Sequence, residues 1–146
     1  MKLSTRGRYA TRALLDLACH WGAGPVPLKD IARRQEISLN YLEHLITPLI
    51  IAGVMRSHRG PAGGVELAKS PASIRLSEVI RLVEGNLEPV DCVGSPELCP
   101  RSGSCVTRDV WVELEMAVRS VLDSVTLEDL AERQKKRDLS LSVGMV

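Results

Sequence analysis

Residues 28–68, LKDIARRQEISLNYLEHLITPLIIAGVMRSHRGPAGGVELA, decide the fold of this chain. Apolar residues recur at intervals of three and four in LKDIARRQEI and again in LNYLEHLITPLIIAG, the spacing of one helix face. Ser38 is placed to cap the second helix, Pro48 favours a bend or an early end, and Gly53 is a natural stop. Two short helices joined by a tight corner predict a helix-turn-helix.

The segment that follows, residues 54–70, predicts a β-hairpin. It joins two short apolar stretches, the second with Val65 and Leu67 alternating, through a tip rich in glycine and proline. A hairpin directly after a helix-turn-helix is a wing. We therefore expect a mainly α fold with a small β-hairpin, in which a winged helix-turn-helix domain spans residues 1–84.

Helical patterns flank this unit. Residues 5–21 carry one apolar helix face, and a further helix is expected to begin at Ser77 and to end at Gly85. The longest periodic segment, residues 106–122, corresponds to about 25 Å of helix. Its apolar stripe consists of Val106, Val110, Leu114, Ala117 and Val121, widened by Trp111, Val118 and Leu122. Because the preceding domain has its own core, we expect this stripe to pack against a second copy of the chain in a homodimer.

The remaining segments complete the expected organisation. Residues 85–105 form a cysteine-rich loop, and residues 106–135 form the dimerisation helix and a short terminal helix. Thr126 and Asp129 are spaced for a capping box at the start of that last helix. Residues 136–146 are charged and then weakly patterned, so we expect a flexible tail.

Composition limits the class of protein. Of the 146 residues, 45% are hydrophobic and 25% charged, which excludes disordered, collagen-like and membrane classes. No apolar run approaches the roughly 20 residues of a membrane span, and the N-terminal segment lacks the pattern of a signal peptide, so we expect a cytoplasmic protein. Residues 1–69 carry ten Lys and Arg against five Asp and Glu, whereas residues 70–146 carry nine against thirteen. A basic amino-terminal half favours a polyanionic partner.

The second helix of the helix-turn-helix and the hairpin tip are predicted to contact double-stranded DNA. A helix in the major groove reads base edges from its first turns, and a basic, glycine-rich tip can approach the phosphates closely. The predicted DNA-binding residues are Ser38, Asn40, Tyr41, Glu43 and His44 from the helix and Arg56, His58, Arg59 and Gly60 from the wing. The alternatives are a solvated helix face and an ordinary turn with solvated charges. Five such residues opposite a full apolar face favour DNA binding, although the ring of Tyr41 is expected to belong mostly to the core.

Other functions are disfavoured by the sequence. The tip RGPAGGVE lacks the Gly-Lys-Ser/Thr ending of a phosphate-binding nucleotide loop and opens no helix. The three histidines are scattered and form no catalytic set, so we expect no catalytic residue and no enzyme. The basic residues near the start of the first helix are predicted to add phosphate contacts; they are Lys2, Arg6, Arg8 and Arg12.

Three of the four cysteines, Cys92, Cys99 and Cys105, lie within fourteen residues. Clustered thiols in a reducing compartment more often bind metal or carry out redox chemistry than form structural disulfides. The spacing Cys-x6-Cys-x5-Cys disfavours zinc, whose sites favour Cys-x2-Cys pairs and a fourth Cys or His, and suits an iron–sulfur cluster. A regulatory disulfide between two of the three is the alternative. Cys19 is expected to be a small buried hydrophobic residue.

The segments KLSTRGRYATRALLDLA, VPLKDIARRQEISLNYLEHLI and AGVMRSHRGPAGGVELA, followed by the three-cysteine loop, resemble in order and spacing the Rrf2 family of bacterial winged-helix transcription regulators. The resemblance covers about residues 1–135 and is nearest to the branch of iron–sulfur cluster regulators. It implies a homodimer that binds DNA with the winged helix-turn-helix and pairs through the long helix. In the sensor branches it also implies a cluster held by the cysteine loop.

The chain departs from this family at the fourth cluster ligand. The resemblance implies a histidine three residues after the last cysteine, and that position is Arg108, whose guanidinium stays protonated and is a very poor ligand. The acidic residue of the nitric oxide-sensing branch is likewise replaced, by Arg8. The remaining candidates are Asp109, Glu97 or another nearby carboxylate, a histidine brought by folding or by the partner subunit, and an exogenous thiol or water.

The sequence therefore predicts a DNA-binding transcription regulator that senses iron–sulfur, redox or nitric oxide status through an iron–sulfur cluster held by Cys92, Cys99 and Cys105. We expect a [2Fe-2S] rather than a [4Fe-4S] cluster. The alternative is a cluster-free regulator of the same fold that is switched by cysteine thiol oxidation or by partner protein binding.

Overall fold

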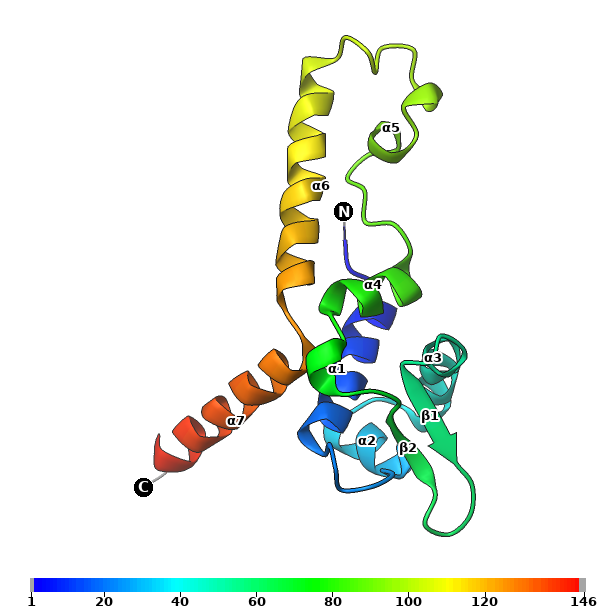
Figure 1. Ribbon diagram of the computed structural model, residues 1–146, viewed down its shortest axis with the longest axis vertical. Coiled ribbons are helices and arrows are strands. Elements are labelled where there is room, and N and C mark those ends of the chain that lie inside the picture. Colours follow the sequence, from blue (N-terminus) through cyan, green and yellow to red (C-terminus); the bar gives the residue numbers. More distant parts are fainter. Residues whose placement is uncertain (1, 145–146) are drawn as a thin grey trace.

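The computed structural model describes residues 2–144 of the chain (Figure 1). Helices and one short hairpin follow one another in the order α1 (Thr5–Cys19), α2 (Leu28–Gln35), α3 (Leu39–Ile51), β1 (Met55–His58), β2 (Gly64–Leu67), η1 (Pro71–Ser73), α4 (Leu76–Glu84), α5 (Asp91–Gly94), η2 (Pro96–Leu98), α6 (Val106–Ser124) and α7 (Leu127–Gly144). This is the predicted mainly α fold with a winged helix-turn-helix. No helix within residues 2–144 is both long and apolar enough to cross a bilayer.

The corner between α2 and α3 has the local chemistry that the sequence predicts. Glu36 adopts φ +54°, a left-handed conformation that ends α2, and the hydroxyl of Ser38 accepts a hydrogen bond from the N–H of Tyr41 at 3.2 Å, which caps α3. Pro48 lies inside α3 without ending it, and the helix stops just before Gly53, whose φ is +77°. The helix-turn-helix is confirmed.

The two strands pair in antiparallel register, from Met55 opposite Leu67 to His58 opposite Gly64. The hairpin is anchored to the segment before α2, because Val26 and Val65 exchange backbone hydrogen bonds of 2.8 and 2.9 Å. A Cβ at Gly64 would lie 2.3 Å from the carbonyl oxygen of Val26. Glycine is therefore required where the wing meets the body of the domain.

One core is formed by the four helices α1, α2, α3 and α4, together with the hairpin and the start of α7. Its fully buried members include Leu14, Ile31, Leu42, Leu49 and Leu127, each with at most 1% of its surface exposed. Burial of each such side chain contributes about 1.5–3 kcal/mol relative to an exposed one. This core fixes α2, α3 and the wing relative to one another.

The helix α4 begins one residue before the predicted Ser77. The N–H of Leu76 donates to the carbonyl oxygen of Val125 at 2.8 Å, and the N–H of Leu127 donates to that of Ile74 at 3.0 Å. This short antiparallel bridge fixes the start of α4 against the junction of α6 and α7. The predicted end at Gly85 is confirmed.

The last helix begins as predicted but is longer than predicted. Thr126 and Asp129 form the capping box, with backbone N–H to side-chain oxygen distances of 2.9 and 3.1 Å. The helical backbone then continues through residues 136–144, for which the sequence predicts a flexible tail. Ser140 and Ser142 donate to carbonyl oxygens one turn earlier in the helix, so their hydroxyls do not interrupt it. Residues 145–146 of the expected tail lie outside the described residues.

The helix α6 stands apart from the core, along the long axis of the molecule, and the loop that carries α5 and η2 rises beside it (Figure 1). Within α6 no residue is buried. The half-buried residues Val112, Glu115, Val118 and Leu122 recur at helical spacing, and the helix contacts α4 and α5. The predicted stripe is therefore divided: Val118 and Leu122 are among these half-buried residues, whereas Val110 and Leu114 lie on a face that this chain leaves exposed.

Candidate functional site

The helix α3 presents a polar face to solvent. Ser38, Asn40, Glu43 and His44 are exposed, whereas the opposite face is buried in the core. The ring of Tyr41 is half-buried and packs edge-to-face on Tyr9, with ring centroids 6.0 Å apart. The tyrosine therefore contributes to the core as expected, and the other four side chains are free to contact a ligand.

In the wing, Glu66 holds two of the four predicted DNA-binding residues. Its Oε1 atom accepts a hydrogen bond from Arg56 Nε at 2.9 Å and lies 2.9 Å from His58 Nε2. Hydrogen bonds from His58 and then Arg56 hold the pKa of Glu66 below its usual value. Arg59 and Gly60, at the tip, are exposed, and Gly60 adopts φ +99°. Glu66 is not among the residues predicted from the sequence, although the hairpin register that sets it opposite Arg56 indicates the pair.

The helix α1 is fixed to the helix-turn-helix by polar contacts. Asp16, only 4% exposed, accepts hydrogen bonds from Arg34 Nε and Nη2 at 2.9 and 2.7 Å and from Gln35 Nε2 at 3.0 Å. Burial raises the pKa of Asp16, but the hydrogen bonds from Arg34 and Gln35 outweigh it and the pKa is lowered. Arg12, a predicted phosphate contact, instead donates to the carbonyl oxygen of Gln35 and lies over the ring of Tyr9 at 5.2 Å.

The three clustered cysteines lie at different points of the loop between α4 and α6. Cys92 is in α5, Cys99 follows η2, and Cys105 is the N-cap residue of α6. All three thiols are free and half-buried, as is Cys19, which packs against the core. Among residues 2–144, no three His, Cys, Asp or Glu side chains are close enough together to hold a metal ion. The loop supplies the thiols without bringing them together.

Cys105 lies at the first turn of α6, where several groups contact its thiol. Its Sγ lies 3.1 Å from the hydroxyl oxygen of Thr107. Hydrogen bonds from the Thr107 side chain and from the backbone N–H groups of Arg108 and Thr107 lower the pKa of Cys105, and the charge of Arg101 adds to them. This is the expected effect of the N-terminal end of a helix on a thiolate.

Arg108, which replaces the histidine implied by the family, makes a structural contact. Its Nε donates to the carbonyl oxygen of Cys92 at 2.9 Å and joins the first turn of α6 to α5. Two histidines are engaged elsewhere, since His20 Nδ1 lies 2.7 Å from the carbonyl oxygen of Asp16 and His58 contacts Glu66. Neither is near the cysteine loop in sequence, and both lie in the amino-terminal domain.

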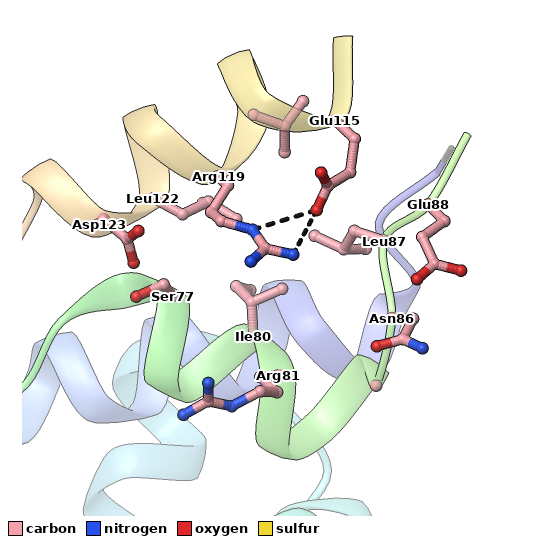
Figure 2. A pocket seen from close by; sticks show the side chains of 12 residues that line it. Ser77, Ile80, Arg81, Asn86, Leu87, Glu88, Glu115, Arg119, Leu122 and Asp123 are labelled. Carbon is pink, nitrogen blue, oxygen red and sulfur yellow. Dashed lines mark hydrogen bonds and ion pairs between the residues drawn. The ribbon is translucent and has the colours of Figure 1, made fainter. Parts of the chain in front are cut away.

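A groove of about 210 Å³ runs between α4 and α6 at the base of the cysteine loop (Figure 2). At its centre Arg119 donates to Glu115, one turn earlier on the same helix α6, and Ile80 and Leu122 form apolar walls. The side chain of Arg119 is 69% exposed, so the groove is open to solvent. It adds no catalytic group to the site described above.

The exposed face of α3 and the hairpin beside it define a winged helix-turn-helix regulator. Two solved structures share this architecture. One is CymR, the global cysteine regulator of B. subtilis, with a TM-score of 0.79 and 39% identity, covering 91% of this chain and 98% of that chain. The other is IscR of T. potens, with a TM-score of 0.78 and 39% identity, covering 94% of this chain and 90% of that chain.

The sequence profile of the Rrf2 family, described as an iron-dependent transcriptional regulator, matches residues 3–133. The chain belongs to the Rrf2 family of transcriptional regulators. The HTH-type transcriptional regulator IscR of Xenorhabdus nematophila is 41% identical over 140 residues, which cover 96% of this chain and 85% of that protein.

Proposed function

We propose that this Rrf2-family regulator binds DNA with α3 and the wing, and that it senses iron–sulfur, redox or nitric oxide status through an iron–sulfur cluster held by Cys92, Cys99 and Cys105. The observation that carries the proposal is the position of three free thiols in one loop, which joins the DNA-binding domain to the exposed helix α6. Similarity to proteins named IscR supports the cluster.

DNA recognition follows from the exposed groups. The first turns of α3 enter the major groove, where Asn40 pairs with adenine and Glu43 accepts from cytosine. At the wing tip, Arg59 is not held by Glu66 and is available for a phosphate or a narrow minor groove. These assignments predict both a sequence preference and a strong dependence on salt.

The DNA assignments are tested with a duplex selected from a random pool by the wild-type protein. Arg59→Ala should weaken binding uniformly and reduce the slope of log K against log salt by about 1, whereas Asn40→Ala should relax the preference at one base pair. Lys136→Ala, on the exposed part of α7, is the control and should change neither. Unchanged binding in both test variants would overturn the assignments.

A homodimer through α6 is part of the proposal. The apolar stripe of α6 is exposed in the single chain, with Val110 at 53% and Leu114 at 41%. A second copy that covers this stripe would set two α3 helices at a fixed distance. Half-sites one helical turn apart, about 34–36 Å, are the usual spacing for such dimers.

The donor set fits an iron–sulfur cluster. Three soft sulfur ligands are present, all unpaired, and the lowered pKa of Cys105 gives it a larger thiolate fraction than an ordinary thiol has at the same pH. When bound, the group supplies a centre that responds to redox state and to nitric oxide. We propose [2Fe-2S] rather than [4Fe-4S], with a fourth ligand other than Arg108, which is bonded to the Cys92 carbonyl oxygen.

The second candidate is a cluster-free regulator of the same fold, switched by thiol oxidation or by partner protein binding. The lowered pKa of Cys105 favours it, because a thiolate is the form that oxidants attack. Two of the three thiols would give two electrons and two protons to a thiol oxidant and form one disulfide. The solved structure of an oxidized form of Staphylococcus aureus CymR, with 39% identity and a TM-score of 0.73, supports this candidate.

Colour separates the two candidates. The full chain purified without oxygen should be brown, with visible absorption and equal amounts of iron and sulfide, if it carries a cluster. A thiol switch is colourless under the same conditions and instead shows loss of two free thiols per chain on oxidation. A colourless preparation that also resists reconstitution with iron and sulfide would exclude the cluster.

A further inference from the structure

The carboxylate of Glu84 receives several hydrogen bonds at one oxygen. The backbone N–H of Ser4 donates to Glu84 Oε1 at 3.0 Å, the Ser4 hydroxyl donates to the same atom, and the N–H of Gly7 donates at 2.9 Å. Ser4 is the N-cap residue of α1, and its own hydroxyl also accepts from the Gly7 N–H at 3.4 Å, so Glu84 adds a second, closer acceptor at this end of the helix. A residue 80 positions away in sequence therefore caps α1.

The N-terminal end of α1 is shaped for this carboxylate. The first turn of α1 contains no acidic residue, so Glu84 supplies the negative charge that the positive end of the helix dipole favours. Gly7 is buried against it, and a Cβ at that position would lie 2.2 Å from Glu84 Oε1. Any side chain at position 7 would push the carboxylate away, so the glycine leaves room for it.

The other side of Glu84 leads into the cysteine loop. Glu84 is the last residue of α4, and Gly85 follows with φ +77°, a conformation that favours glycine. Residues 86–90 then run to Cys92 without helix or strand. Since Val83 is buried in the core, a change in the path of the loop acts first on Gly85 and Glu84.

The helix α1 is also joined to the helix-turn-helix. Its buried Asp16 is held by Arg34 and Gln35 at the end of α2, and its Arg12 donates to the carbonyl oxygen of Gln35. These contacts lie directly before the corner that leads into α3. Glu84, next to the cysteine loop, thus contacts the first turn of α1, and Asp16, near the other end of α1, contacts the helix-turn-helix.

We propose that Glu84 is a positioning residue that transmits the state of the cysteine loop to α1, and through α1 to α2. This inference rests on the proposed sensory role of the loop. When the loop changes its path, the carboxylate moves relative to the N–H groups of Ser4 and Gly7, and the N-terminal end of α1 loses or gains the acceptor that Glu84 adds to the Ser4 cap.

Amide hydrogen exchange followed by NMR tests the role of Glu84 directly. All proteins carry Cys19→Ala, so that only the loop thiols react. Diamide takes two electrons and two protons from two thiols and leaves one disulfide. It therefore converts the loop from its reduced state to a state with one disulfide. In the otherwise wild-type chain the exchange rates of the Ser4 and Gly7 amides should change about threefold or more between the two states.

Glu84→Ala should accelerate exchange of these two amides about ten- to a hundredfold already in the reduced state, because a hydrogen bond to a charged acceptor is lost. It should then abolish their response to diamide. Glu78→Ala is the matched control, since Glu78 lies on the same helix but pairs with Lys69. If Glu84→Ala does not fold, Glu84→Gln, which keeps one acceptor oxygen without the charge, should give a smaller acceleration of the same amides.

Two results would overturn the inference: Ser4 and Gly7 amides that do not respond to the loop in the otherwise wild-type chain, or a full response that survives in Glu84→Ala. DNA affinity measured on the same samples decides the proposed function separately. If the amides respond but the affinity for the selected duplex stays constant, the proposed switch fails while the role of Glu84 stands.

Discussion

Arg108 Nε donates a hydrogen bond of 2.9 Å to the backbone carbonyl oxygen of Cys92, across sixteen residues of sequence. The contact joins the first turn of α6 to α5 and directs the guanidinium to a backbone oxygen. The resemblance to the family implies a metal-binding histidine at this position. The residue that closes the cysteine loop here is therefore one that cannot serve as a ligand.

Substitution of Arg108 by histidine should lengthen the life of the proposed cluster. The variant adds an imidazole ligand at the position implied by the family, and we expect loss of visible absorption in air to slow by about tenfold. Arg119→His, three turns further along α6, is the control and should leave the rate unchanged. An Arg108→His protein that bleaches at the wild-type rate would contradict a ligand position at residue 108.

The lowered pKa of Cys105 predicts its reactivity. Thiolate forms as the pH rises through the pKa, so alkylation by iodoacetamide should reach half its maximal rate below pH 9.0, the ordinary value for a thiol. The rate is followed against pH in a chain whose three other cysteines are alanine. Thr107→Val removes the hydroxyl and should move the midpoint upward. A midpoint at or above 9.0 in the parent, or no shift in the variant, would refute the assignment.

The pair of Asp16 and Arg34 should stabilise the domain strongly. Arg34→Ala leaves a carboxylate that is 4% exposed without its main partner, and we expect a loss of about 3 kcal/mol in the free energy of unfolding by urea. Arg33→Ala is the matched control on the same helix, because the Arg33 side chain is 74% exposed and 3.9 Å from Asp30. Its expected effect is within about 0.5 kcal/mol. Equal effects in the two variants would contradict the account.

The same pair predicts a dependence on pH. Because Arg34 and Gln35 lower the pKa of Asp16 in the folded chain, the contribution of this carboxylate is complete above its unfolded pKa of about 3.8. It is lost as the pH falls through the lowered, folded-state pKa. The difference in stability between the wild type and Arg34→Ala should therefore shrink in acid, whereas a constant difference from pH 7 to pH 3 would exclude this linkage.

Dimerisation through α6 predicts a difference between two faces of one helix. Val110→Glu places a charge within the exposed apolar stripe and should raise the dimer dissociation constant about a hundredfold or more, as measured by light scattering. Met116→Glu also changes an exposed apolar residue of α6, but six positions on and therefore on another face. It should leave the dimer intact, and a monomeric wild type would exclude the interface.

Local patterns in the sequence predicted most of the fold. Helical spacing identified α1 and α3, Ser38 and the pair of Thr126 and Asp129 marked helix starts, and the glycine-rich tip identified the hairpin. These features depend on residues a few positions apart, which a single sequence displays directly. The predicted start of α4 was one residue late, because the observed start depends on a backbone bridge to a segment some fifty residues away.

The contacts that position the candidate site were not predictable in this way. The Asp16–Arg34 pair, the cap that Glu84 places on α1 and the bond from Arg108 to Cys92 each join residues far apart in sequence. Only the folded chain brings them together. The three cysteines were identifiable from their spacing, but spacing alone does not give their distances, and the loop as described within residues 2–144 does not gather all three at one metal site.

The central claim is that the state of the cysteine loop controls DNA binding. The most direct measurement is the affinity for one selected duplex of the anaerobically reconstituted protein, the cluster-free reduced protein, and a variant with Cys92, Cys99 and Cys105 all replaced by alanine. We predict that the wild type changes its affinity or its base preference by about tenfold between its two states, as is typical of coupling between two sites. The alanine variant should bind as the cluster-free protein does, whether or not it has been taken through the reconstitution. Equal binding by all three samples, with unchanged base preference, would contradict the account.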